Sequence, residues 1–163
     1  MVVVSNTSPI SNLAIIGRLN LLHSQFQEIW IPSAVHAELG QLTHTAAWNE
    51  IQQACYDGWI KPQSLKDTKV AGLLGVNLDR GEAEAIALAL ELSSDLLLLD
   101  ERDGRSAAAH SGLRVTGILG ILLRAKNERQ IELLKPELDA LRARARFFLS
   151  APLIEKVLQI AGE

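Results

Sequence analysis

Oxygen-bearing side chains stand at four well-separated places in this chain, each beside an apolar segment. Asp100 directly follows a run of four leucines, and Asn6 follows three valines after one serine. Glu38 and Glu82 lie within segments whose apolar residues have helical spacing. Carboxylate and amide oxygens are the donors that hard divalent cations such as Mg²⁺ and Mn²⁺ prefer. If the fold brings these segments together, the sequence predicts a metal site suited to attack on phosphorus.

The elements that must position these residues are short. Four consecutive leucines, Leu96–Leu99, are too few to span a membrane and predict a strand buried on both faces of a parallel sheet. Further strands are expected at Val2–Val4, Glu28–Ile31, Trp59–Lys61 and Arg114–Val115. Helical segments separate them, so the sequence predicts a three-layer α/β/α sandwich around a parallel sheet of four to five short strands.

The expected helices follow from apolar spacing and from proline and glycine boundaries. They are a helix begun by Pro9 with a break near Gly17, then helices at 32–40, 43–56, 81–92, 102–111 and 117–126, and C-terminal helices within 131–146 and 153–160. Residues 63–80 give the weakest pattern, with a short helix at 70–74.

Topology places the four side chains at one edge of the sheet. Asn6 and Asp100 follow parallel strands, so both lie at the carboxyl edge, where ligands of open α/β sheets bind. Glu82 is in the first turn of the helix before the leucine strand, which begins at this same edge, and Glu38 is on the helix that leaves the second strand. Two further carboxylates are close along the chain, those of Glu84 and Asp103.

Helix capping is the alternative explanation for most of these residues taken singly. Asp79-x-x-Glu82 fits a capping box, Asp100-x-x-Asp103 fits a looser one, and Asn6 is a suitable cap for the helix that follows it. Glu38 lies too far into its helix to be a cap. Capping accounts for the positions one at a time but does not explain why four of them share one edge.

Composition narrows the class of protein. The 163 residues suit one domain, and 48% hydrophobic with 21% charged residues is a globular composition. The net charge of −3 excludes nucleic-acid binding by overall charge, so any such binding must use a local patch. Cys55 is the single cysteine and cannot form an internal disulfide. No signal-peptide pattern or long apolar segment is present, so we expect a cytoplasmic protein without a membrane anchor.

Taken in order, four motifs resemble those of the PIN-domain nucleases, which include the VapC-type toxins. They are Val2–Pro9, Ile31–Leu39, Gly81–Ile86 and Leu98–Asp103. The resemblance covers about residues 1–126 and is closest to a PIN-like subfamily with Asn in the first motif; helices at 130–163 complete a single PIN-like domain over 1–163.

The resemblance implies a ribonuclease that uses Mg²⁺ or Mn²⁺. Its metal ligands would be Asn6, Glu38, Glu82 and Asp100, with Asp103 as a further catalytic residue. The third acidic role goes to Glu82 rather than Glu84 because the family's two late acids are 18 residues apart, as are Glu82 and Asp100. The implied partners are an RNA substrate and an antitoxin protein, and the apolar C-terminal segment is compatible with a homodimer.

One departure leaves a second interpretation open. The family usually has Asp where this chain has Asn6, although Thr7 and Ser8 match the family's hydroxyl positions. An amide oxygen can bind a metal ion but brings no charge. The alternative is therefore a catalytically weakened PIN-like module that binds nucleic acid.

Two groups of basic residues lie outside the four proposed ligands. Arg102 and Arg105 are placed to meet a phosphate backbone or to pair with local acids. A C-terminal group is expected to be a solvated face or a dimer contact, with RNA phosphates as the third possibility; it consists of Arg142, Arg144 and Arg146, followed by Phe147 and Phe148.

Overall fold

The computed structural model describes residues 1–163 and is built on a five-stranded parallel sheet with strand order β3-β2-β1-β4-β5. The strands are β1 Val3–Ser5, β2 Ile29–Ile31, β3 Ile60–Pro62, β4 Leu96–Leu98 and β5 Val115–Thr116. The first strand occupies the centre, and the leucine strand pairs with it on one side and with β5 on the other.

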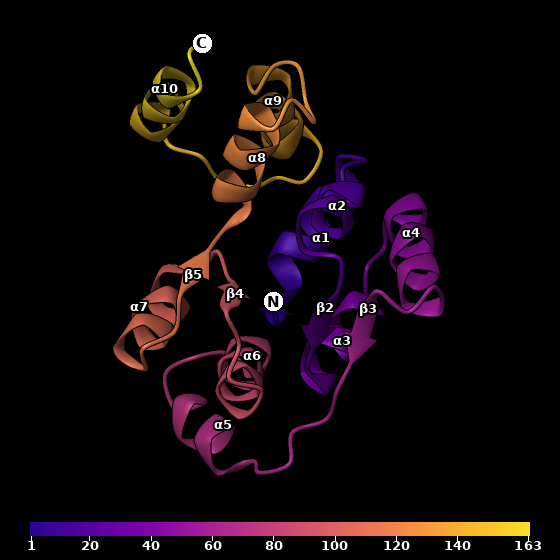
Figure 1. Cartoon of the computed structure of the whole chain (residues 1–163), viewed down its shortest axis with the longest axis vertical. Helices are drawn as coiled ribbons and strands as arrows, with labels where there is room; N and C mark the ends of the chain where they lie inside the picture. Colours follow the sequence, from indigo (N-terminus) through magenta and orange to yellow (C-terminus); the bar gives the residue numbers. More distant parts are fainter.

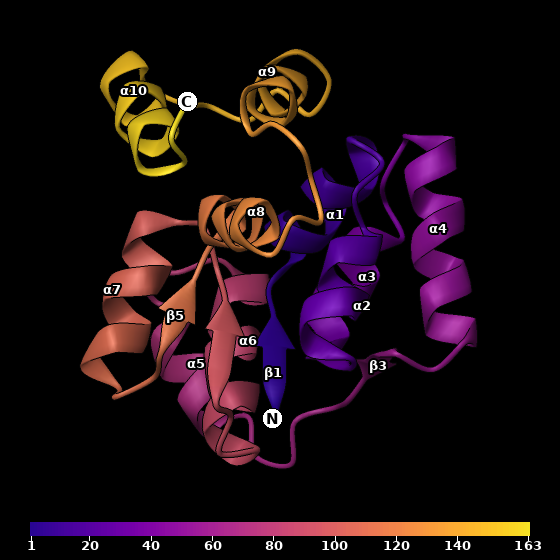
Figure 2. The same ribbon diagram turned by 45° about the horizontal axis from the view of Figure 1, so that its top comes forward.

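Ten helices surround the sheet (Figures 1 and 2). They are α1 Thr7–Ile15, α2 Asn20–Phe26, α3 Ser33–Leu39, α4 Thr45–Tyr56, α5 Lys69–Leu74, α6 Arg80–Glu91, α7 Arg102–His110, α8 Ile118–Asn127, α9 Lys135–Ala143 and α10 Ala151–Ile160. The predicted three-layer α/β/α sandwich is confirmed. No helix combines the length and the apolar character that a bilayer span requires.

Alternation along the strands creates a separate apolar core on each face of the sheet. Val3 and Leu98 pack into the larger core, which includes residues of α1, α2, α4 and α8. Val4 and Leu97 point to the opposite face and pack against α6 and α7. All four side chains are fully buried, which explains why the strands are apolar runs without polar alternation.

The order of the strands creates a switch point beside β1. From β1 the chain builds β2 and β3 on one side, then crosses over to build β4 and β5 on the other. Asn6 and Asp100 follow two neighbouring strands, and the Asn6 amide N donates to Leu98 O at 3.0 Å. The crevice at such a switch point is the usual ligand site of an open α/β sheet.

Most boundaries differ from those predicted by one or two residues, and two of these differences have a clear local cause. The first helix begins at Thr7 rather than at Pro9, which occupies the third helical position. Proline is tolerated there because N–H groups of the first turn have no partner within the helix. The helix at 43–56 begins at Thr45, where the ring Nδ1 of His44 accepts a hydrogen bond from Ala47 N at 3.1 Å.

The C-terminal helices lie beyond the carboxyl ends of the strands. In Figure 2, β1 and β4 point toward α8, and α9 and α10 lie on the far side of that helix. Only Val157 of α10 is buried, so this helix contributes little to either core.

Candidate active site

Asn6 lies at the centre of the candidate site. It is 4% exposed and stands at the N-cap position of α1 with extended backbone geometry. Its side chain makes no capping hydrogen bond, and its buried Oδ1 has no hydrogen-bond partner. The alternative that Asn6 serves as a helix cap is therefore wrong, because the backbone has the cap geometry while the side chain takes no part in it.

The next two hydroxyls connect the first turn of α1 to two of the predicted acids. The Thr7 hydroxyl donates to Oε2 of Glu38. The Ser8 hydroxyl donates to Oδ2 of Asp100 at 3.0 Å and accepts from Asn12 Nδ2 at 2.9 Å. Side chains separated by 62 residues in sequence thus meet on adjacent residues of one helix turn.

Glycines allow the acids to approach neighbouring helices closely. A β-carbon on Gly81, in the first turn of α6, would lie 2.5 Å from Glu38 Oε1. A β-carbon on Gly104 of α7 would lie 3.1 Å from Glu82 Oε1. The carboxylates of Glu38 and Glu82 therefore occupy space that a residue larger than glycine at position 81 or 104 would fill.

Glu82 caps its own helix and is also buried. The predicted capping box is confirmed: Asp79 Oδ1 accepts from Glu82 N at 2.8 Å, and Glu82 Oε2 accepts from Asp79 N at 3.2 Å. Burial raises the pKa of the Glu82 carboxyl above its usual range, and the negative charge of Asp79 adds to the increase. Capping thus engages Oε2, whereas Oε1 lies against α7.

Asp100 stabilises a helix other than the one predicted. The N-cap of α7 is Glu101, so the looser box from Asp100 to Asp103 is wrong. Oδ1 of Asp100 instead accepts from Ile118 N at 2.8 Å, at the start of α8. Burial raises the pKa of the Asp100 carboxyl, and the hydrogen bonds from Ile118 N–H and from Ser8 offset part of the increase.

The two neighbouring acids have other surroundings. Glu84 accepts from Ala34 N at 3.2 Å in the first turn of α3 and pairs with Arg80 at 2.9 Å. It stabilises the packing of α3 on α6, which leaves Glu82 as the acid of this helix that faces Gly104. Asp103 is exposed and lines a hollow between α5 and α7, and it makes no hydrogen bond to the other predicted ligands.

The donor set fits a hard divalent cation by its chemistry. Its atoms are carboxylate oxygens together with an unpartnered amide oxygen, and two of the carboxyls have raised pKa values that a nearby cation would lower. No three His, Cys, Asp or Glu side chains converge closely enough to hold an ion by themselves. Mg²⁺ does not need such a cage, because in proteins it usually keeps several waters and binds one or two carboxylates plus a substrate phosphate.

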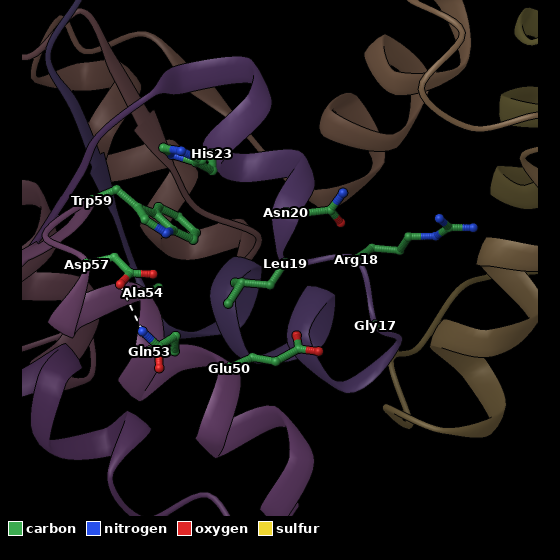
Figure 3. Close-up of a pocket in the computed structure, with 10 residues that line it drawn as sticks. All are labelled: Gly17, Arg18, Leu19, Asn20, His23, Glu50, Gln53, Ala54, Asp57 and Trp59. Atoms are coloured by element: carbon green, nitrogen blue, oxygen red, sulfur yellow. Dashed lines mark hydrogen bonds between the residues drawn. The ribbon is translucent and has the colours of Figure 1, made fainter.

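A second hollow lies apart from these residues. It measures 530 Å³ and is lined by Gly17–Asn20, by residues of α4 and by Trp59, directly before β3 (Figure 3). The ring of His23 lies 4.9 Å from that of Trp59. None of the predicted site residues borders this hollow, so the switch-point crevice is the better candidate.

The prediction from sequence missed the groups that hold the acids in place. Gly117 and the Ile118 amide were given no role, and Gly81 was named only as part of a motif; a β-carbon on Gly117 would lie 2.5 Å from Asp100 Oδ1. One available signal was a glycine directly before an acid, as at Gly81-Glu82. The contact of Asp100 with the start of α8 has no local signal, because it joins residues 18 apart.

Comparison with known proteins adds three findings. A family model described as a PIN domain matches residues 2–163; PIN domains are generally nucleases and typically use divalent metal ions. Among solved structures, the fold is similar to a PilT N-terminus domain protein from the hyperthermophilic archaeon Sulfolobus solfataricus. The TM-score is 0.54 at 22% identity, covering 77% of this chain and 93% of the other, a likeness that supports the fold alone. No curated protein matches the chain in sequence.

Proposed function

The chain belongs to the PIN domain family, and from this we propose that it is an endoribonuclease that hydrolyses phosphodiester bonds with Mg²⁺ or Mn²⁺. In this proposal Asn6, Glu38, Glu82 and Asp100 hold the ion directly or through water. Asp103, which lies apart from them, would face the substrate.

One observation supports the proposal most. The buried Oδ1 of Asn6 has no partner, and the two residues that follow it bond to Glu38 and Asp100 at the switch point of the sheet. A buried acceptor without a partner costs about 1–3 kcal/mol. A ligand that binds this oxygen would recover that free energy, and a cation shared with the carboxylates is the ligand whose chemistry fits.

The residues of the chain would divide the work as follows. A bound divalent ion supplies positive charge to the phosphate and lowers the pKa of an attacking water. Thr7 orients Glu38, while Ser8 and Ile118 N–H fix both oxygens of Asp100. Arg105 lies beside Asp100, and its Nη1 donates a hydrogen bond to Leu99 O at 3.1 Å. Its positive charge would neutralise negative charge on the substrate.

The test is cleavage of a labelled single-stranded RNA with and without Mn²⁺. Asp100→Asn should lower the rate by on the order of 10²–10⁴-fold, because it removes charge from the group that holds the ion. Asp57→Asn is a matched control, since Asp57 is an exposed acid of the second hollow and should leave cleavage unchanged. Equal cleavage by Asp100→Asn and the parent would refute the assignment.

Thermal denaturation separates this effect from loss of folding. Because burial raises the pKa of Asp100, the folded protein binds more protons than the unfolded chain between about pH 4 and that raised pKa. Its stability therefore falls as pH rises through this window. The uncharged Asp100→Asn variant should have a melting temperature at pH 7 equal to or above that of the parent. The difference between the two melting temperatures should shrink as the pH is lowered.

The second candidate function is nucleic-acid binding without catalysis. It is favoured by the neutral Asn6 and by the lack of three converging acids. This candidate expects RNA binding by the parent with no Mn²⁺-dependent cleavage, and gain of cleavage when position 6 carries an acid.

The toxin role and an antitoxin partner form the biological part of the proposal and rest on the family, whereas the homodimer rests on the apolar C-terminal segment. Induced expression of the chain should arrest growth of a bacterial host, and expression of Asp100→Asn should not. Equal arrest by both would separate toxicity from the proposed site.

A further inference from the structure

A hollow of 400 Å³ opens directly beside the candidate site. Asp100, Arg105 and Gly117 line it. Phe147, Phe148 and Leu149 of the segment before α10 line it as well. An aromatic wall therefore adjoins the carboxylate that we place at the metal, although the two are almost 50 residues apart in sequence.

Phe148 is held outward in this wall by its neighbours. It is 87% exposed, whereas Leu149 is 6% exposed and Phe147 packs against the larger core. The Phe147 amide donates to Leu141 O at 2.9 Å, and the Ser150 hydroxyl accepts from Leu153 N at 3.3 Å at the start of α10. The backbone is thus hydrogen-bonded on both sides of Phe148, and the ring between these points is open to a ligand.

Arg105 provides a positive group in the lining of the hollow. Its Nη1 donates to Leu99 O at 3.1 Å, and it forms no ion pair within 4 Å, although its charge offsets part of the rise in the pKa of the neighbouring Asp100 carboxyl. A guanidinium has five N–H donors, so most of them stay available for an anion such as phosphate.

We propose that this hollow binds an unpaired nucleotide of a single-stranded RNA, with the base stacked on Phe148 and an adjacent phosphate on Arg105. This rests on the proposed function, since it extends the substrate from the bond to be cleaved to its neighbour. Sequential bases of single strands stack on exposed aromatic rings, whereas bases within a duplex are not accessible to such a ring. The hollow therefore selects unpaired RNA.

The first experiment measures binding of a fluorescein-labelled 10-nucleotide RNA by anisotropy, with Ca²⁺ in place of Mn²⁺. Phe148→Ala should weaken binding about tenfold, and Phe148→Tyr should retain it, because a stacking ring is worth that much per base. Tyr56→Ala is the matched control, since Tyr56 is 88% exposed on the distant helix α4. A duplex of the same sequence should bind more weakly and be insensitive to Phe148→Ala.

A second experiment identifies the contact. Single abasic sites are introduced at each position of the RNA in turn, and one of them should weaken binding to the parent but not to Phe148→Ala. Equal RNA affinity of Phe148→Ala and the parent would overturn the proposal. So would sedimentation velocity that finds a dimeric parent and a monomeric Phe148→Ala with unchanged RNA affinity, which would assign the ring to a contact between two copies.

The two proposals fail in distinguishable ways. If the parent binds RNA in a Phe148-dependent manner but never cleaves it with Mn²⁺, the endoribonuclease proposal fails and the stacking site holds. If the parent cleaves and Phe148→Ala binds and cleaves RNA equally well, the stacking site fails alone.

Discussion

Asn6 is the residue on which the chemistry of the site most depends. An aspartate at this position would add a charge beside the half-buried Glu38 and Asp100, whereas the amide adds only a dipole. The buried Oδ1 of Asn6 has no partner, and this lowers the stability of the folded state. An asparagine with a purely structural role would avoid the loss by accepting a hydrogen bond from the first turn of α1. The unpartnered oxygen therefore supports our proposal that Asn6 binds an ion.

The variant Asn6→Asp tests this explanation. Without metal the new carboxylate would be buried beside the residues that bond to Glu38 and Asp100, so we expect a lower melting temperature at pH 7. Added Mn²⁺ should raise the melting temperature of the variant more than that of the parent, because the ion binds the folded state and gains a charged ligand. Thermal melts over a Mn²⁺ series measure both effects.

The matched control is Asn49→Asp, which makes the same change at an exposed residue of helix α4, outside the hydrogen bonds of the candidate site. It should not increase the Mn²⁺ response as Asn6→Asp does. A response of Asn6→Asp no greater than that of the parent would show that position 6 does not face the ion.

At the scale of elements, the N-terminal turns of three helices position the groups of the candidate site. The first turns of α1, α6 and α8 contribute, respectively, the two hydroxyls, the Gly81-Glu82 pair and the Ile118 amide. The positive end of a helix dipole favours acids at such places. Because these three helices begin at the carboxyl edge of the sheet, their starts meet where β1 and β4 end.

Gly81→Ala tests the close approach of α3 and α6. The new methyl would lie 2.5 Å from Glu38 Oε1, and the flexible Glu38 side chain can move aside at little cost in stability. We expect a nearly unchanged melting temperature together with a loss of Mn²⁺ affinity or cleavage of roughly 10- to 100-fold, the effect of displacing a supporting group.

Gly72→Ala is its control, because Gly72 lies in α5 with nothing within 4 Å of an added β-carbon. It should stabilise the protein by up to about 1 kcal/mol through helix propensity and leave cleavage unchanged. If Gly81→Ala and Gly72→Ala bind Mn²⁺ and cleave RNA equally well, the close contact of Glu38 with α6 has no role in function.

At the scale of the molecule, the C-terminal helices are fastened to the N-terminal half by a few polar contacts. Arg18, in the turn after α1, bonds to Glu137 Oε1 of α9 through Nε at 3.0 Å and Nη2 at 2.6 Å. Arg144 Nη2, directly after α9, donates to Ile15 O at 2.8 Å, at the end of α1. Within the C-terminal part, Glu163 Oε2 accepts from Leu134 N at 2.6 Å, at the start of α9. These contacts set the position of α9 and α10, and with them the segment that carries Phe148.

The variant Arg18→Met tests how much the contact between Arg18 and Glu137 stabilises the protein. It leaves the Glu137 carboxylate, whose side chain is 9% exposed, without its partner, and we expect a loss of about 2 kcal/mol in the free energy of unfolding. Urea denaturation measures it. The double variant Arg18→Met/Glu137→Met should lose less than the single one, and a larger loss in the double variant would contradict the role assigned to the pair.

Much of the architecture could be predicted from the sequence because its determinants are local. Apolar runs such as Leu96–Leu99 are buried on both sides only within a parallel sheet, and their carboxyl ends share an edge by geometry. The capping box at Asp79 and Glu82 and the break at Gly17, with φ of +73°, follow from residue type as well. Together these determined the fold, the edge and the candidate acids.

Only the tertiary structure decided what each side chain at that edge contacts. It excluded a capping role for the Asn6 side chain, and it showed that Asp100 contacts the start of α8 and Glu84 contacts α3. It also showed that Glu82 and Asp103 make no hydrogen bond to the other predicted ligands. It also brought Phe148 next to Asp100. Such contacts join residues distant along the chain, and they depend on how helices pack on a twisted sheet, which periodicity and capping signals in the sequence do not encode.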